Sequence, residues 1–170
     1  MISLSSKSAL LLYTGIRILS SRFFVFFRFF LEMLEYEVVI LKFWKTAALF
    51  LIGGSGYVGL ELLWRGRSHV SMFLAGGICF LLLGKLNRIH PQLPLLLRGT
   101  VGAVVITSVE LAAGLLANRD YNVWDYRAMP MNFHGQVCLP FSLLWIPLSL
   151  GAMMLYNFLD TRLIKTPESL

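Results

Sequence analysis

Hydrophobic residues along this chain occur in four long runs that are separated by shorter polar segments. The runs cover residues 46–64, 70–86, 93–117 and 137–158. Each is close to the roughly 20 residues (range about 17–25) that an α-helix needs to cross a bilayer. The second run is short unless the ammonium group of Lys85 reaches out to the lipid headgroups. The pattern predicts an all-α, polytopic membrane bundle of four transmembrane helices.

The segment before residue 45 is aromatic-rich, but charged side chains interrupt it. One charge at the centre of a membrane helix costs about 2.5–3.5 kcal/mol on insertion scales, so a crossing that holds several is unfavourable. We therefore expect residues 1–44 to be a basic, aromatic extension with an interfacial helix. The alternatives are a fifth crossing and an extension outside the functional core. The four-helix membrane domain then covers residues 45–160, and residues 161–170 form a cytoplasmic tail.

Composition supports a membrane protein, because only 14% of the residues are charged and 57% are hydrophobic. A soluble domain carries about 25% charged residues. The formal net charge is +6, but basic residues in a membrane protein more often mark its cytoplasmic loops. We expect the lipid bilayer, and not nucleic acid, as the partner. The two cysteines, Cys79 and Cys138, have no metal-binding spacing, so we predict neither a metal site nor a cofactor.

The basic residues also predict an orientation. With four crossings, the N-terminal region, the loop between the second and third runs, and the C-terminus share one side. That side holds 11 of the 15 Lys and Arg residues, and the other side holds Arg65, Arg67, Arg119 and Arg127. The positive-inside rule then places both termini in the cytoplasm. The turn at residues 64–69 and the loop at residues 118–134 face outward.

Two parts of the chain look alike when they are aligned on their cysteines. Residues 71–79 then lie over residues 130–138, so that methionine, glycine and cysteine coincide, and a glutamate precedes each segment. Parallel repeats of this kind occur in transporters, with sites at the interface between the repeats. We therefore expect two similar hairpins with the same orientation.

Glu61 and Glu110 are the leading candidates for a functional site, because each lies inside an apolar run near its outer end. Ionisable groups at that depth are costly and commonly face the bundle interior or a water-filled cavity. Arg65 follows Glu61 by four residues and shares its helix face. Glu61 is thus either half of a structural salt bridge or a proton- or cation-binding carboxylate. Glu110 has no basic residue at the equivalent positions, so we expect it to find a partner on another helix, to hydrogen-bond to one, or to stay protonated.

The outer turn and loop supply the other candidates for binding a substrate or ion. Arg65, Arg67 and His69 lie in a tight turn, so we expect their side chains to cluster and to contact a carboxylate or phosphate, or lipid headgroups. Tryptophan and tyrosine at this depth usually anchor a membrane boundary. The histidine and the glutamine of the loop need polar partners, which Glu61 or Glu110 could supply. The candidates from the loop are Trp124, Asp125, Tyr126, Asn132, His134 and Gln136.

Small residues predict where helices approach closely. Ser55 and Gly59 form a small-xxx-small pair in the first run, and Gly99, Ala103 and Thr107 continue such a face in the third. Such faces bring helix backbones together.

Three strings resemble a known bacterial membrane family: YVGLELLWRGRSHVSMFLAGGICFLLLG, ITSVELAAGLLAN and VWDYRAMPMNFHGQVCLPFSLLW. The family is named Putative ABC-transporter type IV, or CmpB-like, and the resemblance covers roughly residues 45–159. It implies a small multi-helix protein of the bacterial inner (cell) membrane with the same glutamates and outer loops. It leaves residues 1–44 as a variable extension. The family name implies a permease.

We therefore expect a transport-related, permease-like component with an outward-facing polar site. Four helices are few for a solitary transporter, and no Gly-Lys-Ser/Thr follows the glycines at 53–56, so the nucleotide-binding loop of an ATPase is missing. Assembly into a homo-oligomer, or with other membrane and ATPase subunits, would then complete the transporter. One alternative is an integral membrane enzyme acting on a lipid or lipid-linked substrate, with Glu110 and His134 as an acid–base pair. The other is a non-catalytic accessory protein. The sequence favours a protein that is not an enzyme.

Overall fold

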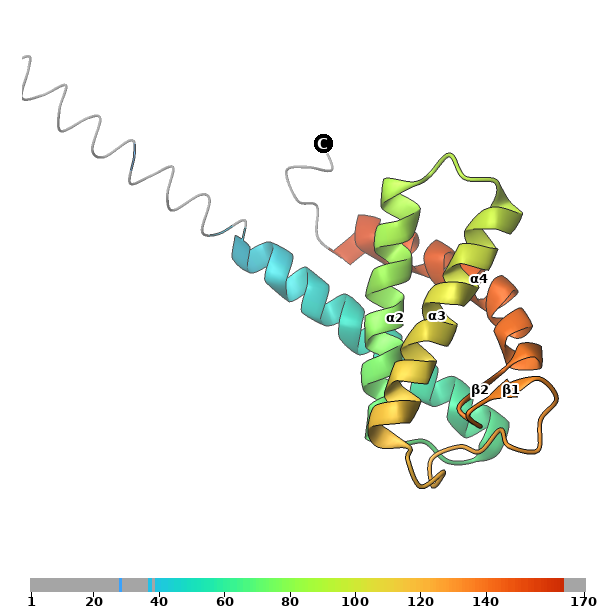
Figure 1. Ribbon diagram of the computed structural model, residues 1–170. Helices are drawn as coiled ribbons and strands as arrows, with labels where there is room; N and C mark the ends of the chain where they lie inside the picture. The colour runs from blue at the N-terminus through green and yellow to red at the C-terminus, as the bar shows by residue number, and fades with distance from the viewer. Residues whose placement is uncertain (1–27, 29–36, 38, 164–170) are drawn as a thin grey trace, which may run out of the picture. The chain divides into compact units, whose positions relative to one another are not determined.

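The computed structural model describes residues 28, 37 and 39–163. Within them lie four helices long and apolar enough to cross a membrane, the first of which is Val39–Arg65. It is followed by α2 (Val70–Ile89), α3 (Leu95–Ala117) and α4 (Leu139–Leu163). In Figure 1, α2 and α3 lie side by side, and α4 crosses behind them. The predicted four-helix, all-α bundle is thus confirmed, whereas most of the predicted interfacial helix in residues 1–44 lies outside the described residues.

The helix bounds differ from the hydrophobic runs in two places. The first helix begins at Val39 and not at residue 46, so it continues through Lys42 and Lys45. Helix α2 continues to Ile89, past the predicted end at residue 86. At about 1.5 Å per residue its 20 residues span about 30 Å, the thickness of a bilayer's hydrocarbon core. Helix α2 is therefore long enough without help from Lys85.

The turn between the first helix and α2 is explained by two local features. Gly66 has φ +70, and its N–H donates to the Leu62 carbonyl at 3.0 Å. A glycine in this left-handed conformation is a common way to end a helix. The His69 side chain then caps α2 by accepting a hydrogen bond from the Ser71 backbone N–H at 3.2 Å. The chain therefore reverses direction within four residues.

The loop between α3 and α4 contains a short β-hairpin that the sequence did not predict. Strands β1 (Asn132–Phe133) and β2 (Val137–Cys138) pair antiparallel. His134 and Gly135 have φ +51 and +62, and the Gln136 N–H donates to the Phe133 carbonyl at 3.1 Å. This is a type I′ turn, which suits the twist of a hairpin. Helix α4 consequently begins at Leu139, after the predicted start at residue 137.

The hairpin also overturns the alignment on the two cysteines. Residues 71–79 are regular helix inside α2, whereas residues 130–138 are a turn followed by both strands. Cys79 thus lies in a helix interior, and Cys138 precedes a helix. The matched residues do not occupy equivalent places in two similar hairpins.

Glycines bring the first helix close to α2, on a different face from the predicted one. A Cβ atom added to Gly53 would lie 2.3 Å from the Cβ of Phe80 on α2. A Cβ atom added to Gly59 would meet nothing within 4 Å, and Ser55 is exposed. The predicted Ser55–Gly59 face is therefore open, and the packed face of this helix contains Gly53.

The predicted small face of α3 is confirmed, and it packs against α4. A Cβ atom on Gly99 would lie 3.0 Å from Ile146 of α4. Farther along α3, the Thr107 hydroxyl donates to the Ser142 hydroxyl at 3.2 Å. The central core is formed by Cys79, Leu83, Ala103, Ile106, Trp145 and Met153.

Asp160, near the end of α4, joins three helices through ion pairs. Its carboxylate lies 3.0 Å from the Lys45 ammonium group of the first helix and 2.6 Å from the Arg88 guanidinium of α2. Asp160 thus fixes the first helix and α2 to α4 at one end of the bundle.

Candidate functional site

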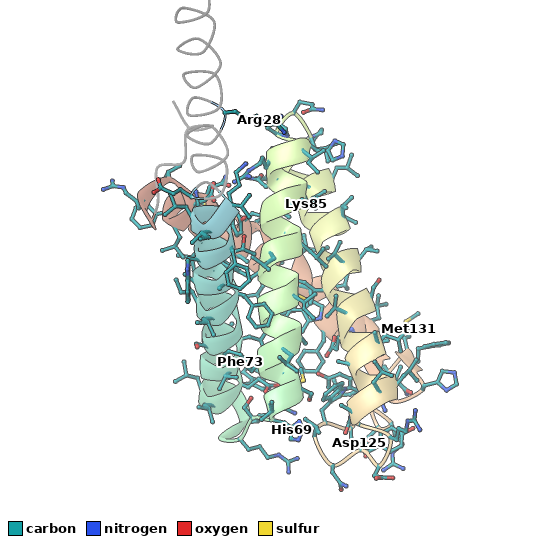
Figure 2. All side chains as sticks on the ribbon, turned by 90° about the vertical axis from the view of Figure 1, so that its left-hand side faces the viewer. Arg28, His69, Phe73, Lys85, Asp125 and Met131 are labelled. Atoms are coloured by element: carbon teal, nitrogen blue, oxygen red, sulfur yellow. The ribbon has the colours of Figure 1, made fainter. Side chains whose placement is uncertain are left out.

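The turn and the hairpin loop meet at the same end of the bundle. Figure 2 shows His69 and Asp125 at this end and Lys85 toward the other. We call the end formed by residues 61–69 and 118–138 the hairpin end. It holds the candidate residues that the sequence assigned to the outer side.

Glu61 lies at the hairpin end in a local network. One of its carboxylate oxygens pairs with the Arg65 guanidinium, and the other accepts from the Ser68 hydroxyl at 2.5 Å. Arg65 also donates to the Val123 carbonyl at 2.9 Å. The predicted pair with Arg65 is confirmed, and it also ties the end of the first helix to the hairpin loop.

Glu110 is buried, with 4% of its surface exposed. One carboxyl oxygen accepts from the Tyr126 hydroxyl and the other from the Trp145 indole N–H, both at 3.1 Å. Tyr126 belongs to the hairpin loop and Trp145 to α4, so the expected partner on another element is confirmed. Among the described salt bridges, none involves Glu110. Neutral donors, and not cations, hold this carboxyl group.

Tyr126 is suited to remain a donor in this arrangement. Burial raises the pKa of its phenol, and the neighbouring Glu110 carboxylate raises it further. The phenol therefore keeps its proton at neutral pH, and its O–H group donates a hydrogen bond to the Glu110 carboxyl group. The ring of Tyr126 also stacks on Phe141 of α4, with ring centroids 5.0 Å apart.

A pocket of about 200 Å³ lies between the first helix and α4 near the hairpin end. Glu61 and Arg65 form its polar part. Glu110 does not line the pocket, although both of its donors do, so these two side chains separate it from the open space. The two glutamates therefore do not face one shared hollow. The pocket is lined by Tyr57, Leu60, Glu61, Trp64, Arg65, Tyr126, Phe141, Leu144, Trp145 and Leu148.

A larger apolar cavity of about 400 Å³ adjoins this pocket along the same two helices. The two spaces share Tyr57, Leu60, Trp145 and Leu148. The larger one extends past Gly56 and Gly151. We call the two adjoining spaces together the groove; the charged side chains among its described lining residues, Glu61 and Arg65, lie near the hairpin end.

The basic residues of the turn do not cluster as predicted. Arg65 points to Glu61 and the hairpin loop, whereas Arg67 and His69 line a separate hollow of about 290 Å³ with Asn122. Arg67 is exposed, and the His69 ring caps its own helix. The reason is that Glu61 and Val123 together bind the Arg65 guanidinium and draw it away from its neighbours.

Trp124 lies in the interior of the hairpin loop. It is 3% exposed, and its indole N–H donates to the Gln136 carbonyl at 2.8 Å. Its neighbour Asp125 is exposed and pairs with Arg127 at 2.7 Å. Hydrogen bonds from Arg127 hold the pKa of Asp125 below its ordinary value, so this carboxylate belongs to a local surface pair.

Asn132, His134 and Gln136 make their hydrogen bonds within residues 118–138 and not to the glutamates. Gln136 exchanges two hydrogen bonds with Asn118, each 3.0 Å long. Asn132 is exposed, and its side-chain oxygen accepts from the Gly135 N–H at 3.1 Å. His134 is exposed at its turn and is not a hydrogen-bond donor to Glu110. The predicted contacts of His134 and Gln136 with the glutamates are therefore wrong.

Asn118 is an organising residue that the sequence analysis missed. It is 2% exposed. Its side chain donates to the Trp124 carbonyl at 2.6 Å and accepts from the Val123 N–H at 2.9 Å, in addition to its bonds with Gln136. Its signal in the sequence was its place directly after a long apolar run, where a helix must end.

We expect Asn118→Ala to loosen the hairpin loop, because it removes three side-chain hydrogen bonds worth about 1 kcal/mol each. Limited proteolysis by trypsin at Arg119 and Arg127 should speed up at least tenfold. Asn122→Ala is the matched control, because Asn122 is exposed in the same loop and should leave the rate near that of the parent. Equal rates for the two variants would show that this network does not order the loop.

These observations define a class of protein. Four helices of spanning length with exposed apolar side chains, such as Leu63 at 88% and Leu116 at 75%, make this a multi-pass α-helical membrane protein. The chain belongs to the family described as “Putative ABC-transporter type IV”, which it matches over residues 10–169. The match confirms the family resemblance and extends it into residues 1–44, which the resemblance had left out. No curated protein and no solved structure matches the chain.

Proposed function

We propose that this chain is the substrate-contacting membrane subunit of a transport assembly. The observation that carries the proposal is the pocket between the first helix and α4, where Glu61 and Arg65 face an otherwise apolar space. Charged groups inside membrane segments are costly and commonly mark substrate or ion pathways. The family description agrees with this role.

The orientation that we propose places both termini in the cytoplasm of a bacterial cell and the hairpin end outside its inner membrane. The support is the distribution of basic residues, 11 of 15 of which fall on the proposed cytoplasmic side. The pocket at Glu61 then lies near the outer surface.

A transport assembly needs further subunits, because the described helices do not enclose a pathway alone. The groove is open along the first helix and α4, and Gly56 and Gly59 leave space beside it. A second copy, or another membrane subunit, would lie beside it and complete the pathway. Because the sequence lacks a nucleotide-binding loop, ATP hydrolysis would come from a separate subunit.

The geometry gives the enzyme alternative less support. Both carboxyl oxygens of Glu110 accept hydrogen bonds from Tyr126 and Trp145, and His134 lies on an exposed turn. The acid–base pair on which that alternative depended is therefore not assembled.

The test is to purify the tagged full-length chain from its own host membranes in lipid nanodiscs and to measure its composition and ATP hydrolysis. We expect an ATP-binding subunit in a fixed ratio and vanadate-sensitive hydrolysis. An unrelated four-helix protein with the same tag, taken from the same cells, is the control. Recovery of the chain without a nucleotide-binding subunit would favour the accessory role and contradict the proposal.

A further inference from the structure

We infer that the groove between the first helix and α4 binds a lipophilic organic cation. Its ammonium-type head would lie among the aromatic side chains near Glu61, and its apolar tail would follow the adjoining cavity. This inference rests on the proposed function, because it assigns a substrate class to the same pocket.

The first argument is the aromatic lining of the pocket. Two aromatic pairs frame it: Tyr126 stacks on Phe141, and the Tyr57 and Trp145 ring centroids lie 6.2 Å apart. Trp64 completes the lining. Aromatic faces attract cations, and cages of this composition are the usual way to recognise quaternary ammonium groups.

The second argument is the balance of charge. Among the described residues, Arg65 is the only basic one that lines the pocket, and it is already bound by the Glu61 carboxylate and the Val123 carbonyl. Glu110 lies directly behind Tyr126 and Trp145 and has no basic partner among the described salt bridges. Both side chains donate to its carboxyl oxygens, and these electronegative acceptors make the two rings more electron-rich. The pocket therefore favours a cation over an anion.

The third argument is the route by which a ligand reaches the pocket. Leu60 and Leu148 line both spaces, yet they are 52% and 37% exposed on the outer surface of the helices. In a membrane that surface faces lipid, so the groove opens to the bilayer. A molecule that first partitions into the membrane can enter sideways, which selects an amphiphile over a hydrophilic solute.

The adjoining cavity provides room for a chain-like tail. Gly56 and Gly151 line it, and a Cβ atom on either would meet nothing within 4 Å. Its apolar lining and its volume of about 400 Å³ suit an alkyl chain, and no charged side chain among the described residues lines it to pair with a second headgroup. The groove thus matches a molecule with one charged end.

The experiment measures equilibrium binding of radiolabelled dodecyltrimethylammonium to the full-length chain in phosphatidylcholine nanodiscs. The binding to nanodiscs that contain no protein is subtracted. We expect one saturable site. Dodecyl sulfate, which has the same tail and a negative head, should compete at least tenfold more weakly than unlabelled dodecyltrimethylammonium. Equal or stronger competition by dodecyl sulfate, or the absence of a saturable site, would overturn the inference.

Two variants locate the site. Trp64→Leu removes an exposed aromatic ring from the pocket and breaks no hydrogen bond among the described ones. It should weaken binding about 5- to 30-fold, the equivalent of one cation–π contact of about 1–2 kcal/mol. Trp44→Leu is the matched control, since Trp44 is an exposed tryptophan of the same helix far from the pocket, and should leave affinity unchanged. Equal effects of both variants would contradict the assignment.

A competing occupant of the groove is a helix of a second copy. Gly56→Cys places a thiol in the groove, and both natural cysteines are buried. Nearly complete cross-linking between copies, with loss of the binding site, would show that the second copy fills the groove and would overturn the inference. If the chain binds the cation but copurifies with no ATP-binding subunit, only the proposed function is contradicted. If it copurifies with that subunit but does not bind the cation, only the substrate class is contradicted.

Discussion

Replacing Gly53 with alanine should destabilise the bundle by about 1–3 kcal/mol, the usual cost of overpacking a close contact. The new methyl group would lie 2.3 Å from the Cβ of Phe80. A Cβ atom cannot move aside as the end of a flexible side chain can, so the first helix and α2 must separate. Unfolding of the purified protein in mixed micelles, titrated with sodium dodecyl sulfate, measures the change.

Gly59→Ala is the control for this substitution. It introduces the same methyl group into the same helix, where nothing lies within 4 Å, and the greater helix propensity of alanine should leave stability equal or slightly higher. If Gly59→Ala proved the more damaging of the two, the first helix would have to pack through its Ser55–Gly59 face, contrary to the structure.

The second large effect is expected at Glu110. Glu110→Ala leaves the Tyr126 hydroxyl and the Trp145 indole N–H without their acceptor, and each buried donor left unpaired costs about 1–3 kcal/mol. Glu110→Gln retains one acceptor oxygen and should lose about half as much. In the same unfolding titration, the parent should therefore be the most stable protein, Glu110→Gln less stable, and Glu110→Ala the least stable.

A second measurement separates stability from function at this residue. Glu110→Gln should insert normally and retain most of the fold, so its affinity for dodecyltrimethylammonium can be compared with that of the parent. We expect weaker binding, because the amide presents a single acceptor oxygen and so enriches only one of the two donor rings. Unchanged affinity in a well-folded Glu110→Gln protein would limit Glu110 to a structural role.

The sequence predicted the helices well because hydrophobic runs of membrane length have few alternative structures. Spacing within one helix was equally informative: the interval of four residues between Glu61 and Arg65 predicted their pair. The choice of packed face was harder. Both Gly53 and Gly59 are small, and only the position of Phe80 on α2 decides which of them is covered.

Contacts between distant parts of the chain explain the remaining errors. Trp145 is 35 positions from Glu110, and no periodicity connects an indole on one helix with a carboxyl group on another. The hairpin was missed because its strands have two residues each, too few for an alternating pattern. Its one local signal, a glycine after His134, is also common in ordinary loops.

The ion pairs at Asp160 give the bundle a mechanical asymmetry. Lys45 fastens the first helix to α4 at that end, whereas the pocket separates the same two helices toward the opposite end. The salt bridge therefore acts as the hinge for any tilt of the first helix against α4. Because displacement grows with distance from a hinge, such a tilt would change the width of the pocket at the aromatic rings more than the separation of the two helices at Asp160.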